Sequence, residues 1–153
     1  MAVYFLDSSA LVKRYAQETG SAWVEILTDP QAGHHFYLAR ITAVEVVAAV
    51  ARRQRGGAVS TADATAALAD FAADLTHQYR QVDITSYLIT QAIQLAKTYA
   101  LRGYDAIQLA AVLTVHVARE AQGFSRLTLV SADHELNAAA VAEGLLVDDP
   151  NIH

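Results

Sequence analysis

The segment Val3-Tyr4-Phe5-Leu6-Asp7 places a carboxylate directly after an apolar run. Because the run is continuously apolar rather than alternating, it predicts a short strand, Val3–Leu6, that is buried on both faces. A buried carboxylate without a partner is strongly disfavoured, so Asp7 requires compensation. The simplest sources are the backbone amides of the helix that follows, a metal ion, or both.

Apolar periodicity and turn signals predict strands that alternate with helices along the whole chain. The expected helices cover residues 10–18, 21–28, 42–55, 61–79, 85–101, 105–122 and 133–143, and further strands cover 34–39, 81–84, 127–130 and 145–147. Strands joined through helices run parallel, with right-handed crossovers. We therefore expect an α/β fold in which helices flank a central, mostly parallel sheet. A length of 153 residues suits one domain spanning 1–153.

Composition excludes several classes of function. The chain has no cysteine, which rules out disulfides, thiolate zinc sites and a cysteine nucleophile. No apolar run reaches the ~18 residues of a membrane span, and no secretory signal is visible, so we expect a cytoplasmic protein with no membrane partner. The formal net charge of −5 counts against general nucleic-acid binding.

Four acidic residues occupy equivalent places relative to the predicted strands. Asp7 and Asp133 follow strands, Glu45 lies in the first turn of a helix that follows a strand, and Asp105 begins an apolar helix. In a parallel sheet these positions face one edge, where ligands bind. Converging carboxylates repel one another unless cations are present, and Mg²⁺ and Mn²⁺ prefer carboxylate and water ligands. The joint interpretation is a divalent metal site.

Each acidic residue also has a purely structural explanation. Thr42-x-x-Glu45 has the pattern of a capping box, in which Glu45 would reach back to a backbone amide. Asp105 and Asp133 suit N-caps or first helical turns. Asp7 is the hardest to explain as a cap, because the serines that follow it can already cap the first helix.

Hydroxyl and basic residues near the acidic positions are candidates for supporting roles. Three hydroxyls are placed to hold a water molecule or fix a carboxylate rotamer: Ser8, Ser9 and Ser131. A substrate that carries phosphate would need cations, and those nearest the acidic motifs are Lys13, Arg14 and Arg40. For Arg52, Arg53 and Arg55 we expect stabilisation of a helix C-terminus. The histidines show no metal-binding signature.

Four ordered segments resemble the PIN-domain family, and most closely the VapC toxins of bacterial and archaeal toxin–antitoxin systems. These segments are Leu6-Asp7-Ser8-Ser9-Ala10-Leu11-Val12-Lys13, Thr42-Ala43-Val44-Glu45, Tyr104-Asp105-Ala106-Ile107-Gln108-Leu109-Ala110 and Ser131-Ala132-Asp133-His134-Glu135-Leu136. The resemblance implies a PIN-like three-layer fold and a nuclease dependent on Mg²⁺ or Mn²⁺. It also implies the acidic quartet Asp7, Glu45, Asp105 and Asp133, a transfer or messenger RNA substrate, a homodimer, and a protein antitoxin that blocks the site.

The leading hypothesis is a metal-dependent endoribonuclease. A metal-activated water would attack an RNA phosphodiester in line, with Asp7 and Asp105 as the strongest ligands and Glu45 and Asp133 completing the site. One alternative is a catalytically silent PIN-like interaction module, against which the retention of four acids argues. Another is an aspartate-based phosphoryl-transfer protein. Such proteins carry an Asp-x-Asp motif after the first strand, whereas this chain has Ser9 in place of the second aspartate.

Overall fold

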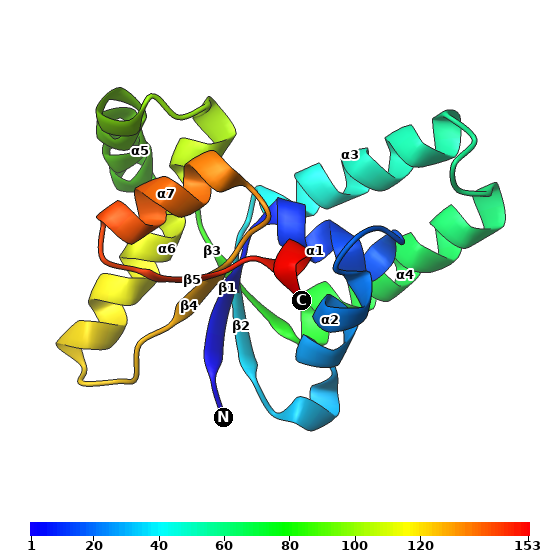
Figure 1. Cartoon of the computed structure of the whole chain (residues 1–153), viewed down its shortest axis with the longest axis horizontal. Helices are drawn as coiled ribbons and strands as arrows, with labels where there is room; N and C mark the ends of the chain where they lie inside the picture. Colours follow the sequence, from blue (N-terminus) through cyan, green and yellow to red (C-terminus); the bar gives the residue numbers. More distant parts are fainter.

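A computed structural model describes residues 1–153. Its centre is a sheet of five parallel strands in the order β3-β2-β1-β4-β5. The strands are β1 Val3–Leu6, β2 His35–Ala39, β3 Tyr79–Val82, β4 Thr128–Val130 and β5 Leu146–Asp148. Phe5 in the central strand lies beside Tyr37 on one side and Leu129 on the other. The predicted parallel α/β architecture is confirmed (Figure 1).

Seven α-helices connect and cover the strands. They are α1 Ser8–Tyr15, α2 Ser21–Leu27, α3 Thr42–Arg55, α4 Thr61–His77, α5 Ser86–Tyr99, α6 Gly103–Ala121 and α7 His134–Ala142, with 3-10 turns η1 Pro30–Ala32 and η2 Pro150–Ile152. β3 begins two residues before the predicted strand, because the buried Tyr79 belongs to the core and starts the strand. None of the helices combines the length and apolarity needed to cross a membrane.

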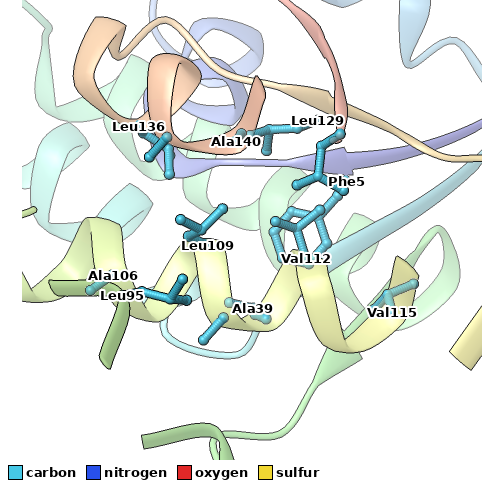
Figure 2. Close-up of a cluster of buried hydrophobic side chains, with 14 of the residues drawn as sticks. Phe5, Ala39, Leu95, Ala106, Leu109, Val112, Val115, Leu129, Leu136 and Ala140 are labelled. Atoms are coloured by element: carbon cyan, nitrogen blue, oxygen red, sulfur yellow. The ribbon is translucent and has the colours of Figure 1, made fainter. Parts of the chain in front are cut away.

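One face of the sheet is covered by α5, α6 and α7. Figure 2 shows Leu109 and Val112 of α6 beside Phe5, and all three side chains are fully buried. Leu136 of α7 belongs to the same cluster. Burial of such side chains contributes about 1.5–3 kcal/mol each, which fixes α6 and its acidic first turn against the sheet.

The opposite face is covered by α1, α2, α3 and α4. Leu6 and Val130 point into this second cluster, together with Leu11 of α1, Val46 of α3 and Phe71 of α4. β1 is therefore buried on both faces, as its continuous apolar sequence predicts. Figure 1 shows α3 and α4 as a hairpin that extends away from the sheet.

The strand order reverses beside β1. The chain moves from β1 through β2 to β3 on one side, whereas β4 and β5 lie on the other side. At such a switch point the connections leave in opposite directions and open a crevice beyond the carboxyl ends of the strands. Here the crevice lies beyond the ends of β1 and β4, which Asp7 and Ser131 immediately follow.

Candidate active site at the sheet switch point

All four acidic residues line one cleft of about 470 Å³. Asp7 is the N-cap of α1, Asp133 is the N-cap of α7, and Glu45 and Asp105 lie in the first turns of α3 and α6. Four segments that are distant in sequence thus contribute one carboxylate each. Parallel strands deliver the N-termini of α1, α3 and α7 to the same edge, whereas Asp105 is brought there by α6, which follows α5.

Asp7 is almost fully buried, with 2% of its surface exposed. Its Oδ2 atom accepts hydrogen bonds from the Ser9 amide at 3.2 Å and the Ser9 hydroxyl at 2.5 Å. Asp7 is therefore the N-cap, and the expectation that Ser8 or Ser9 caps α1 is wrong. Aspartate and serine are equally good N-caps, so the sequence could not separate them.

The second oxygen of Asp7, Oδ1, is buried and has no hydrogen-bond partner. Burial raises the pKa of Asp7 to about 6, the hydrogen bond from Ser9 opposes this rise, and the charge of Glu45 adds to it. A buried carboxylate oxygen without a donor is costly. It is also what a bound cation would compensate, so the residues present fit a divalent ion.

The predicted supporting hydroxyls hold carboxylates and join segments of the cleft. The Ser9 hydroxyl donates to Asp7 and accepts from the Ala132 amide at 3.0 Å, which ties α1 to the loop after β4. The Ser131 hydroxyl lies 3.4 Å from Asp7 Oδ2 and accepts from the Asp133 amide at 3.1 Å. The rotamer of Asp7 is thereby fixed from both sides.

Glu45 is held by side chains from two other helices. Its Oε2 accepts from the Ser8 hydroxyl at 2.9 Å, and its Oε1 accepts from Gln108 Nε2 at 3.0 Å. The capping box suggested by Thr42-x-x-Glu45 does not form, because Ile41 is the N-cap and has no side-chain cap bond. Thr42 instead accepts a hydrogen bond from Gln108 at 2.8 Å.

Gln108 is a residue that sequence reasoning missed. It is 1% exposed on an otherwise apolar face of α6, one turn after Asp105. A buried polar residue one turn after an acidic candidate was the available signal, because residues three apart lie on the same helix face. Gln108 links α6 to Glu45 and Thr42 of α3.

Asp105 and Asp133 form the other side of the cleft. The pKa of Asp105 is raised to about 6, first by partial burial and then by the charges of Asp133 and Asp7, while Arg102 opposes the rise. Asp133 Oδ1 accepts from the Leu136 amide at 2.8 Å, so the N-cap expectation for this residue is confirmed. Its other oxygen accepts no hydrogen bond from the protein.

None of the four carboxylates forms an ion pair with lysine or arginine. No three acidic or histidine side chains converge closely enough to hold a metal ion directly. Mutual repulsion favours this separation, and hydroxyls, amides and helix ends hold each carboxylate in place. The cleft thus has acidic walls rather than a closed cage, and Mg²⁺ commonly keeps several waters between itself and protein.

The basic residues predicted to contact substrate do not line the cleft. Lys13 is buried and donates to Glu18, Arg14 pairs with Asp74, and Arg40 pairs with Asp83. The cations on the cleft wall are Arg52 and Arg53, for which the sequence suggested only helix-end stabilisation. Their spacing of seven and eight residues from Glu45, two helical turns, was the signal that could have placed them on this face.

No protein-family model matches the chain. Two ribonucleases of Mycobacterium tuberculosis, VapC45 (strain CDC 1551 / Oshkosh) and VapC49 (strain ATCC 25618 / H37Rv), are each 32% identical to it over 148 residues. These alignments cover 96% of this chain and 95% of each relative.

Solved structures share the fold. PAE2754 from Pyrobaculum aerophilum matches with a TM-score of 0.62 and 21% identity, over 95% of this chain and 89% of that one. A toxin–antitoxin complex from Klebsiella pneumoniae matches with a TM-score of 0.61 and 17% identity, over 98% of both chains.

The five-stranded parallel sheet with its acidic switch-point cleft is that of a PIN-domain nuclease. Within that class, the chain belongs to the VapC family of ribonucleases, the toxins of VapBC toxin–antitoxin systems.

Proposed function

We propose that this chain cleaves RNA phosphodiester bonds in the acidic cleft, with Asp7, Glu45, Asp105 and Asp133 as its catalytic residues. The observation that carries the proposal is the buried, unpartnered Oδ1 of Asp7 in a cleft lined by three further carboxylates without ion pairs. A fold that leaves this charge uncompensated favours binding of a cation there.

The residues that would hold Mg²⁺ or Mn²⁺ are Asp7 and Asp105 first, completed by Glu45 and Asp133. Ribonucleases of the VapC family typically depend on a metal ion, and the oxygen-only donor set of the cleft suits these hard cations. Such an ion supplies a more acidic water for attack on phosphorus and stabilises the departing oxygen.

The chain's own residues orient the acidic groups before substrate arrives. Ser9 and Ser131 hold Asp7, while Ser8 and Gln108 hold Glu45. Fixed groups need no reorganisation during the reaction, which is the main source of electrostatic catalysis. Asp7 and Asp105 both have a pKa of about 6. Asp105 is the more exposed of the two, so it is the carboxylate that an attacking water in the cleft would reach as a proton acceptor.

We further propose that a protein antitoxin covers this cleft and that the toxin forms a homodimer. Membership of the VapC family supports the antitoxin, as does the structural likeness to a toxin–antitoxin complex. Copurification tests whether the antitoxin binds the toxin. Light scattering with and without the antitoxin measures the molar mass and so tests the homodimer. A monomeric toxin that retains full cleavage in excess antitoxin would contradict them.

Cleavage of a mixed RNA pool tests the catalytic proposal. We expect wild type to cut RNA with Mg²⁺ or Mn²⁺ and to stop on full chelation, and Asp7→Asn to lose at least ~100-fold in rate. Asparagine caps helices as well as aspartate does, so the fold is retained. Asp29→Asn is the matched control, because Asp29 caps the distant η1 through its side chain.

Equal cleavage by wild type and Asp7→Asn, or cleavage that survives chelation, would overturn the proposal. Absence of cleavage by both proteins with every RNA and metal would favour the non-catalytic interaction module instead.

A further inference from the structure

The cleft continues beyond its carboxylates along α3. Arg52 and Arg53 line it together with Glu45, and the residues between them on this wall are Ala48 and Ala49. At ~1.5 Å of rise per residue, seven to eight helical positions separate the arginines from Glu45 by about 11 Å. The small alanine side chains leave this length of the wall open, and Figure 1 shows α3 extending outward from the sheet.

Arg53 is oriented by a partly buried charge network. One amino group of its guanidinium donates to Glu18 Oε2 and the other to the Ala49 carbonyl at 3.3 Å. Glu18 Oε1 accepts from Lys13 at 2.9 Å, and Lys13 is only 5% exposed. One carboxylate is therefore shared by two cations, so the network retains net positive charge.

The remaining donors of Arg53 have no protein partner, and 31% of its side chain is exposed. Arg52 is exposed and forms neither an ion pair nor a hydrogen bond to protein. An arginine can stabilise the C-terminus of α3 without lining the cleft. Arg55 lies in the same last turn and is outside the cleft. The unpaired Arg52 guanidinium and the net positive network around Arg53 lie beside an acidic cleft and are suited to bind a phosphate.

We propose that Arg52 and Arg53 form a phosphate-binding subsite for the RNA strand. The bound phosphate would lie about 11 Å along α3 from the carboxylates, within a few nucleotides of the phosphodiester that is cut there. Lys13 acts through Glu18 as a positioning residue, since it keeps Glu18 from neutralising Arg53. The inference rests on the proposed function, because it takes the acidic end of the cleft as the point of cleavage.

The test is the salt dependence of RNA binding, measured without cleavage. Anisotropy of a labelled single-stranded RNA of about 12 nucleotides, a length typical of single-strand binding sites, is followed with Asp7→Asn protein in chelator. Each lost phosphate contact lowers the slope of log K against log salt by ~0.7 for a single strand. We expect Arg52→Gln to lower it by about 0.7 and Arg52→Gln/Arg53→Gln by up to about 1.4, whereas Arg55→Gln leaves it unchanged.

Cleavage kinetics in the otherwise wild-type chain give a second readout. We expect Arg52→Gln to raise KM about tenfold, the usual weight of one hydrogen bond to a charged group, with kcat unchanged. Because Arg52 has no partner in the protein, this variant loses no native contact and keeps its melting temperature. The KM difference should vanish for RNAs trimmed so short that they no longer reach from the cut to the arginines.

An unchanged slope in the double variant, or an equal loss in Arg55→Gln, would overturn the subsite. A lower kcat with unchanged KM would overturn it as well. If the slope falls as expected but no metal-dependent cleavage is found, the phosphate subsite stands and the proposed catalytic function fails.

Discussion

Gln108 uses both hydrogens of its amide nitrogen on oxygens of α3. One is donated to Thr42 and the other to Glu45, while its carbonyl oxygen has no partner and is buried. Turning the amide over would place that oxygen against the Glu45 carboxylate, so the charge of Glu45 fixes the orientation. A neutral side chain on α6 thus controls where an acidic side chain on α3 points.

Replacement of Gln108 by methionine, which has a similar length, tests this control. We expect kcat and the affinity for Mn²⁺ to fall roughly 10- to 100-fold, as is usual when the support of a metal-site ligand is removed. KM for RNA should change little, since Gln108 is buried away from substrate. Single-turnover cleavage and a metal titration measure the effect, with Gln94→Met on the exposed face of α5 as control.

A folded Gln108→Met protein with wild-type kcat would show that Glu45 does not need this hydrogen bond. Circular dichroism establishes the folded state independently of activity.

Local sequence predicts the helices and strands more readily than it predicts the side-chain contacts at the helix ends. Thr42-x-x-Glu45 has a capping pattern, yet both side chains accept hydrogen bonds from Gln108, which is more than 60 residues away in sequence. Ser9 likewise leaves the capping role to Asp7 and bonds across to Ala132. Contacts between residues so far apart in sequence leave no local pattern. The burial of β1 and the parallel arrangement of the strands do have such a pattern.

The meeting of Asp7, Glu45 and Asp133 at one edge was predictable, because parallel strands bring the N-termini of the following helices together, whereas Asp105 arrives on α6, which follows α5. The basic wall was not predicted. Arg52 and Arg53 are at a helix C-terminus, where cations are common for a local reason. Their spacing from Glu45 places them on the same helix face, but only the direction in which α3 leaves the sheet shows that the cleft extends as far as this turn.

At the scale of elements, α2 is joined to η2 by a close backbone contact at Gly20. Gly20 has φ of +86°, and a Cβ there would collide with the Pro150 carbonyl oxygen. Gly33 has a similar φ of +70° but open space around it. We expect Gly33→Ala to cost about 1 kcal/mol through backbone strain alone, and Gly20→Ala roughly 2 kcal/mol more through the added collision.

Urea denaturation of both variants measures this difference. Trp23, the only tryptophan, stacks on His153 with ring centroids 4.3 Å apart, so its fluorescence reports displacement of η2. Equal stability of the two variants, with unchanged Trp23 emission, would contradict the close contact.

At the scale of the whole molecule, the cleft links stability to protons and cations. Asp7 and Asp105 have pKa values of about 6 in the fold against 3.8 without it. The folded state therefore binds their protons more tightly, so stability from these groups grows as pH falls through 6 and is complete below about 3.8. At neutral pH both ionised groups destabilise the fold.

We expect divalent cations to reverse this dependence. Mg²⁺ should raise the melting temperature at pH 7.5, where the carboxylates are ionised, and lose its effect below about pH 6 as protons displace it. Without metal, Asp7→Asn should be more stable than wild type at pH 7.5 and lose that advantage near pH 4. Differential scanning fluorimetry across pH, with chelator or Mg²⁺, gives both comparisons.

An Mg²⁺ effect that is independent of pH, or that persists in Asp7→Asn, would place the cation elsewhere on the molecule. The Asp29→Asn control should behave as wild type throughout.

The two serines that together secure Asp7, Ser9 and Ser131, are 122 residues apart and meet only when β4 has paired with β1. A chain emerging from the ribosome therefore carries Asp7 and Glu45 long before it can assemble the cleft. A toxin that degrades RNA while being translated would threaten its own message. If the cleft is the catalytic site, the strand order delays that danger, because the cleft can assemble only after β4 has been synthesised and paired with β1.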